Sequence, residues 1–278
     1  MSTFSHKLMF SSQIICKRKS KTAFTLAEVL ITLGIIGVVA ALTLPMLIQN
    51  YQKGVALNRL KQTYAQILNA VEITAAENDA GPMGTWGCPR TDFTDPDTGV
   101  YYWMPWTQAC FYMAMKKIAV KMYPRPDDVS HAFCFEGDEY RPYTALDGTR
   151  GRWNTNGNML HTGGYSAKLP NGACVVWHPA VGSHDAGGSL IIDVDGSYAG
   201  FNRAGKDVFV FSYLVNGSNA STYGKNGRTI LPGRHGSEEK TRAQLKEKCS
   251  KAQSGANGTE CSALIMYDGW QIKPDYPW

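Results

Sequence analysis

Acidic residues are absent from the first 23 positions of this 278-residue sequence, although five basic residues lie there. From residue 24 onward, 23 basic residues balance 23 acidic ones, so the larger part of the chain is formally neutral. The net charge of +5 is therefore a local property of the N-terminal segment. A neutral domain lacks the basic surface on which binding to nucleic acid depends, and we expect no nucleic-acid partner.

Sequence signatures of catalysis and of zinc binding are missing as well. No two cysteines are spaced as C-x-x-C, which argues against a zinc site. His178, His184 and Asp185 lie close together in the sequence, but their spacing matches no catalytic or metal-binding motif. We therefore predict that the protein is not an enzyme.

An incomplete calcium motif is present around "DVDG" at residues 193–196. Asp193 and Asp195 begin like a calcium-binding loop, and Asp207 is close enough along the chain to fold back toward them. The full D-x-D-x-D-G-x₅-E spacing is missing, however. These three aspartates are the candidate calcium ligands, while the role that we favour for them is the capping of backbone amides in turns. No other cofactor is expected.

A run of 25 residues, 24–48, contains a single charge, Glu28. The run is long enough to cross a hydrocarbon layer of roughly 30 Å at about 1.5 Å per helical residue. Because basic residues precede it, we expect its N-terminal end in the cytoplasm and residues 49–278 across the membrane. A cleaved secretory signal does not fit, because its apolar core has only about 7–15 residues and a small-residue cleavage site follows it.

The stretch "KTAFTLAEVLITLGIIGVVAALTLP" resembles the N-terminus of type IV prepilins and of type II secretion pseudopilins. The shared pattern is a basic leader, a small residue, Phe-Thr-Leu-x-Glu and a long apolar helix. The resemblance implies that a prepilin peptidase cuts between Ala23 and Phe24 and methylates the new amine of Phe24. Glu28 stands at the acidic position of the family, and Pro45 matches a proline that is common in these helices. Ala23 departs from the usual glycine but is also small.

A lone charge in a bilayer is costly, so such acids are usually paired. The resemblance implies that Glu28 of one subunit meets the Phe24 amine of a neighbour and sets the register of a filament. Removing one partner of a buried pair costs about 3–5 kcal/mol. Pro45 removes a backbone hydrogen-bond donor, so a kink or local melting of the assembled helix is expected near it.

The expected function is therefore that of a structural subunit, minor or specialised, of a type IV pilus or a type II secretion pseudopilus. The partners implied are other pilin or pseudopilin subunits, the prepilin peptidase, the assembly platform of the bacterial inner membrane, and lipid before assembly. The alternative is a single-pass, membrane-anchored periplasmic binding module or enzyme that uses the helix only as a tether.

The remaining sequence predicts an α+β fold in which a long N-terminal helix packs on an antiparallel sheet. The segments expected are a leader (1–23), a membrane-spanning helix (24–48), its amphipathic continuation (49–80) and an exported domain (81–278). The continuation carries an apolar stripe at mostly helical spacing, formed by Tyr51, Val55, Leu60, Tyr64, Ile67, Leu68 and Val71.

Within the exported domain, β-branched and aromatic runs such as "GACVVWHP" and "KDVFVFSYLVNG" predict strands. Further helices are expected over residues 106–123 and 237–253, the second capped by Ser237. "VDGS" predicts a tight hairpin turn, and "ALIMYDGWQI" a final strand. The aromatic tail after it is expected to fold back over the core.

Six cysteines remain beyond the leader, an even number that suggests up to three disulfides in an exported domain. Fifteen connectivities are possible. Cys249 and Cys261 are close in the sequence, and many proteins of the resembling family close a C-terminal loop with a disulfide, so we expect this pair. For the others we choose Cys88–Cys110 and Cys134–Cys174, without a feature of the sequence that excludes other pairings.

Overall fold

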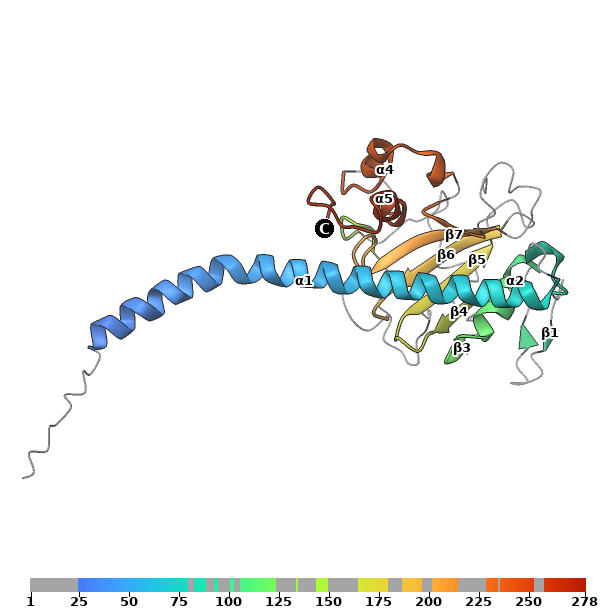
Figure 1. Cartoon of the computed structure of the whole chain (residues 1–278), viewed down its shortest axis with the longest axis horizontal. Coiled ribbons are helices and arrows are strands. Elements are labelled where there is room, and N and C mark those ends of the chain that lie inside the picture. Colours follow the sequence, from blue (N-terminus) through green and yellow to red (C-terminus); the bar gives the residue numbers. More distant parts are fainter. Residues whose placement is uncertain are drawn as a thin grey trace, which may run out of the picture. The chain divides into compact units, whose positions relative to one another are not determined.

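The computed structural model describes residues 25–79, 83–88, 93–94, 101–102, 106–123, 134, 144–149, 165–179, 187–196, 202–214, 229–234, 236–252 and 258–278. The chain divides into two compact units, residues 1–48 and 49–278, which we describe separately. Helix α1 (Leu26–Glu77) contributes its first part to one unit and its second part to the other (Figure 1).

The described part of the first unit is helical and has an exposed apolar surface. Leu26 is 80% exposed and Leu42 is 75% exposed, and the large apolar side chains between them are exposed as well. The helix continues without a break through Pro45. A helix that is apolar all round requires an apolar environment, either lipid or other helices.

In the second unit, α1 turns one face toward the core. The buried residues of this face are Ala56, Leu60, Thr63, Tyr64, Ile67, Ala70, Val71 and Thr74. The expected stripe is therefore confirmed at four of its positions, while Tyr51 is 72% exposed because the buried face begins only at Ala56. Asp79 follows the helix with a φ of 59°, a left-handed conformation that is typical of helix ends.

A six-stranded antiparallel sheet forms the centre of the second unit, and its strands follow one another in chain order. The strands are β3 (Lys121–Tyr123), β4 (Tyr165–Lys168), β5 (Cys174–Pro179), β6 (Gly187–Asp193), β7 (Val208–Leu214) and β8 (Ile230–Pro232). A separate pair is formed by β1 (Phe93–Thr94) and β2 (Tyr101–Tyr102). The predicted α+β class with a long helix and an antiparallel sheet is confirmed.

Alternation along the strands separates two apolar layers. On one face, Trp177 pairs with Leu190 and Leu190 with Phe211, and these side chains join the core that includes the buried residues of α1. Figure 1 shows the second part of α1 running across the sheet. On the other face, the neighbouring register positions Val176, Ile191 and Val210 form a smaller cluster. Because both faces are covered, β7 is buried along its whole length.

Two predicted helices differ from those of the structure. Helix α2 (Trp106–Lys116) ends early, since Lys121 pairs with Lys168 in the sheet and residues 121–123 form β3. The segment 237–253 contains a short 3₁₀ helix, η2 (Ser237–Glu239), and α4 (Arg242–Lys248). Thr241, rather than Ser237, caps α4 through a reciprocal capping box with Gln244. The remaining short 3₁₀ helix is η1 (Met83–Thr85).

The predicted final strand is wrong, because its first part forms helix α5 (Cys261–Tyr267). A short apolar run does not distinguish a strand from a buried helix. Here the Ser262 hydroxyl donates to the carbonyl of Val210 in β7 and accepts from the N–H of Gly233, the residue after β8, and these contacts favour the helix. After α5 the tail folds back as expected. Trp270 packs on Tyr64, with ring centroids 5.2 Å apart, and the hydroxyl of Tyr276 donates to the carbonyl of Gly205 at 2.6 Å.

The predicted tight turn at "VDGS" is also wrong. Asp193 pairs with Val208, so the chain between β6 and β7 runs from Val194 to Asp207. This longer connection carries two of the three candidate calcium ligands, Asp195 and Asp207, and Asp193 is the last residue of β6.

Three disulfides join the second unit, and they are the pairs expected from the sequence. Cys88 is bonded to Cys110, Cys134 to Cys174, and Cys249 to Cys261. The first fastens the segment that follows η1 to α2, the second lies at the smaller apolar cluster, and the third links the end of α4 to the start of α5. Each bond thus holds a short or irregular segment against the sheet or its covering helices.

Candidate functional site

The first turn of α1 holds the acidic residue of the apolar run. Glu28 Oε2 accepts hydrogen bonds from the backbone N–H of Thr25 at 2.8 Å and from the Thr25 hydroxyl at 2.9 Å. The N–H of Glu28 in turn donates to Thr25 Oγ1 at 3.2 Å. Thr25 and Glu28 therefore form a capping box, which satisfies two backbone donors at the start of the helix.

Thr25 is a site residue that the sequence interpretation overlooked. The spacing Thr-x-x-Glu at the start of an apolar run is itself the signature of a capping box, so the signal was present in "FTLAE". The predicted cleavage residues Ala23 and Phe24 lie outside the described residues. Contact between Glu28 and a neighbouring amine therefore stays a prediction.

Pro45 and the glycines Gly34 and Gly37 lie inside continuous helix. A Cβ atom added at either glycine would meet nothing within 4 Å, so no contact inside the chain requires a glycine there. Among the described helices, α1 alone has the length and composition to cross a membrane. The helix is thus consistent with membrane anchoring.

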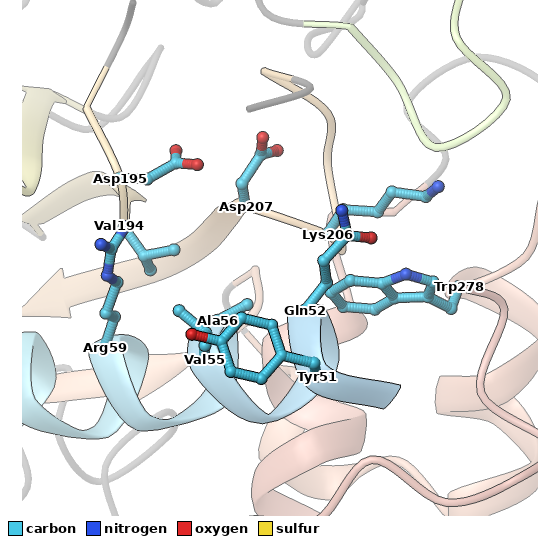
Figure 2. A pocket seen from close by; sticks show the side chains of 10 residues that line it. All are labelled: Tyr51, Gln52, Val55, Ala56, Arg59, Val194, Asp195, Lys206, Asp207 and Trp278. Atoms are coloured by element: carbon cyan, nitrogen blue, oxygen red, sulfur yellow. The ribbon is translucent and has the colours of Figure 1, made fainter. Parts of the chain in front are cut away.

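A pocket of about 150 Å³ opens beside the beginning of α1 in the second unit (Figure 2). Its walls come from α1, from the connection between β6 and β7, and from the chain's last residue. The lining residues are Tyr51, Gln52, Val55, Ala56, Arg59, Val194, Asp195, Lys206, Asp207 and Trp278. The pocket thereby joins three segments that are far apart in the sequence.

The acidic side of the pocket is formed by Asp195 and Asp207, two aspartates of the incomplete calcium motif, and Asp193 lies next to them in the sequence. Asp193 Oδ1 accepts the N–H of Gly196 at 3.1 Å, and the carboxylate of Asp207 accepts the N–H groups of Asn202 and Arg203 at 2.8 and 2.6 Å. These are the turn-capping contacts that we favoured over calcium. Within the described part of the chain, no three His, Cys, Asp or Glu side chains are arranged to hold a metal ion.

The pKa of Asp195 is shifted from its ordinary value. Burial raises the pKa of Asp195 to about 6, and the nearby negative charge of Asp207 adds to the increase. Hydrogen bonding to Asp193 and the positive charge of Arg59 offset it in part. Figure 2 shows Arg59 extending from α1 toward the chain segment that carries Asp195.

The opposite side of the pocket is basic and aromatic. Lys206 Nζ lies 5.8 Å and Lys53 Nζ 5.9 Å from the ring centroid of Trp278, so two cations flank one indole. The pKa of Lys206 is lowered by burial first and then by the positive charges of Arg203, Lys251 and Lys53, while the negative charge of Asp207 offsets part of the decrease. The pocket therefore has separate acidic and basic sides.

Comparison with known families gives two matches. Residues 18–44 match the prokaryotic N-terminal methylation motif. Residues 192–278, which include the pocket residues outside α1, match DUF6613, a family of unknown function. No curated protein and no solved structure matches the chain. The first match identifies a type IV prepilin-like signal and supports a pilin- or pseudopilin-like protein that is anchored in a membrane.

Proposed function

We propose that this protein is a structural subunit of a type IV pilus or a type II secretion pseudopilus, assembled through α1. The observation that carries the proposal is the methylation motif at residues 18–44, which leads into a helix whose first part has exposed large apolar side chains. A helix that serves only as a membrane tether needs an apolar surface but no methylation motif. The motif in addition implies a leader peptidase and assembly with other pilin subunits.

The exposed apolar half of α1 supplies the driving force for assembly. In the membrane, lipid covers this surface, and in a filament the same surfaces of neighbouring subunits cover one another. Head-to-tail contacts between different patches of neighbouring subunits generate helical filaments where they do not close into a ring. The basic leader places the N-terminus in the cytoplasm, so the disulfide-bonded unit lies on the periplasmic side and then on the filament surface.

The capping box gives Glu28 two states in this proposal. Before assembly, Thr25 supplies hydrogen bonds to the Glu28 carboxylate inside its own subunit. In the filament, the methylated amine of Phe24 of a neighbouring subunit adds a cation to the same carboxylate. The chain is large for a main filament subunit, so we assign it a minor or specialised position. No enzymatic role and no cofactor belong to the proposal.

The test begins with the mass of the mature protein in cells that contain an active prepilin peptidase. We expect a chain that starts at methylated Phe24. Glu28→Ala should still insert into the membrane but should be missing from purified filaments, because no carboxylate remains to pair with the neighbour's amine. Glu72→Ala, which removes an exposed carboxylate from the second part of α1, is the matched control and should be incorporated normally.

Two results would contradict the proposal. An intact Met1 terminus in those cells would favour the alternative function, in which the helix only tethers a binding module or enzyme to the membrane. Normal incorporation of the Glu28→Ala chain would remove the pairing from the assembly mechanism.

A further inference from the structure

We propose that the pocket beside α1 binds the headgroup of an aminophospholipid, with the primary ammonium at Asp195 and Asp207 and the phosphodiester beside Lys206 and Trp278. The inference rests on the proposed function only in that the apolar half of α1 enters a bilayer. It assigns a ligand to a pocket that assembly through α1 does not use.

The position of the pocket along the chain places it next to the lipid. Tyr51 and Gln52 line the pocket, and they follow Ile48, the last residue of the apolar run, by only three and four residues. In a helix this separation is about 4.5–6 Å. The polar headgroup layer of a bilayer begins where the hydrocarbon ends, so these residues lie at headgroup depth. Tyr51 and Trp278 are also the residue types that gather at this depth.

One carboxylate oxygen on the acidic side lacks a donor, which an ammonium group would supply, although Arg59 and a hydrogen bond with Asp193 already act on the same side chain. Within the described residues, Asp195 Oδ1 is buried and accepts no hydrogen bond. A buried acceptor without a donor is costly, and such an atom in a folded protein calls for an explanation. Asp207 lies beside it with its carboxylate held by two backbone N–H groups, so negative charge is concentrated there. A primary ammonium carries three N–H donors and a positive charge.

The basic side has the complementary surplus. Lys53 and Lys206 lie around the indole of Trp278, and the positive charges of Arg203 and Lys251 act on Lys206 as well. Asp207 offsets part of this positive charge, and Lys251 Nζ also donates to the backbone oxygen of Trp278 at 3.4 Å. A phosphodiester placed there would relieve the repulsion that remains among these cations. Figure 2 shows Lys206 extending above Trp278, while the carboxylates of Asp195 and Asp207 lie away from the indole. The two sides together suit a zwitterion better than an ion of either sign.

The size of the pocket restricts the ligand further. The pocket has a volume of about 150 Å³, which accommodates several water-sized groups. This space suits a headgroup, whereas a folded segment of a partner protein requires more. A calcium ion would need six to eight oxygen ligands, and the carboxylates here are already partly used in turn capping.

The experiment uses the full chain in detergent micelles and counts bound lipids by native mass spectrometry. Phosphatidylethanolamine, phosphatidylcholine and phosphatidylglycerol with the same acyl chains are added in turn. We expect one retained phosphatidylethanolamine, bound at least about tenfold more tightly than the other two lipids. Phosphatidylcholine has no N–H to donate to Asp195, and phosphatidylglycerol has no cation.

Substitutions inside and outside the pocket test whether the lipid binds there. Asp195→Asn and Lys206→Gln should each reduce the preference for phosphatidylethanolamine about tenfold. Glu72→Gln and Lys61→Gln remove one exposed charge of the same sign from α1 outside the pocket and should leave the preference unchanged. Thermal unfolding of each variant confirms that it is folded.

Several outcomes would overturn the assignment. Equal retention of the three lipids would mean non-specific surrounding lipid, and unchanged retention by Asp195→Asn would place the lipid elsewhere. Displacement of the lipid by micromolar free phosphoethanolamine would reassign the pocket to a soluble ligand, and displacement by calcium would reassign it to a metal. The proposed function is tested separately, since processing at Phe24 and lipid preference are independent measurements.

Discussion

Replacing Asp195 by asparagine should stabilise the second unit at neutral pH. In the folded protein, burial and the charge of Asp207 raise the pKa of Asp195 to about 6, from 3.8 for the free side chain. A difference of about two pKa units corresponds to at most about 3 kcal/mol of unfavourable free energy for the charged form. Because the side chain is only partly buried, solvent screens much of this penalty, and we expect about 1 kcal/mol.

The sign of the pH dependence follows from the direction of the shift. Between about pH 4 and pH 6 the folded chain binds the proton of Asp195 and the unfolded chain does not, so this group lowers stability as the pH rises. The penalty is absent below about pH 4 and complete above about pH 6. Asp193, Asp207, Arg59 and Lys206 face the same pocket region, and they are unchanged in the variant.

The assay is thermal unfolding of wild type and Asp195→Asn in micelles, followed by near-ultraviolet circular dichroism from pH 3.5 to pH 8. The difference in Tm should be close to zero at pH 4 and should reach about 2–4 °C in favour of the variant above pH 6.5. Asp268→Asn is the matched control, because hydrogen bonding to Arg242 lowers the pKa of Asp268. That carboxylate stabilises the fold above its ordinary pKa and loses its contribution as the pH falls, so this variant should be less stable than wild type at neutral pH.

A lower Tm of Asp195→Asn at pH 7.5, or a difference that does not change with pH, would refute this account of the pocket. A higher Tm together with a lost lipid preference would instead support both the electrostatic reasoning and the proposed ligand, since loss of binding could not then be ascribed to unfolding.

Two further predictions concern the core of the second unit. Ile67→Ala should lower the free energy of unfolding by about 2–5 kcal/mol, because Ile67 is completely buried between α1 and the sheet, whereas Ile67→Val should cost about 0.5–1.5 kcal/mol. Leu42→Ala in the exposed apolar half is the control. An equal loss in the free energy of unfolding for this variant would show that the measured transition does not report on the second unit. Replacing Cys249 and Cys261 together by alanine removes a bond with a sequence separation of 12 and should cost about 3 kcal/mol by chain entropy, seen as a Tm lower by about 6–12 °C. An unchanged Tm would mean that the third disulfide constrains nothing in the unfolded chain.

The properties that could be predicted from the sequence are those that depend on residues close together in the chain. The membrane-type helix follows from 25 consecutive positions with one charge, and its methylation motif lies within residues 18–44. The strands of the sheet follow from runs of β-branched and aromatic residues such as "VFVFSYL", which have a high propensity for strands. The Thr25–Glu28 capping box is also local, and it was missed although its four residues are contiguous.

Only the tertiary structure decided the features that depend on distant residues. The run "CSALIMY" became α5 rather than a strand, because Ser262 bonds to β7 and to Gly233 just after β8, which no window around residue 262 reveals. The pocket likewise brings Arg59, Asp195 and Trp278 together from positions more than 80 residues apart. The burial of a side chain, and with it the pKa of an acid such as Asp195, is set by whatever the fold packs around it, and local sequence does not contain that information.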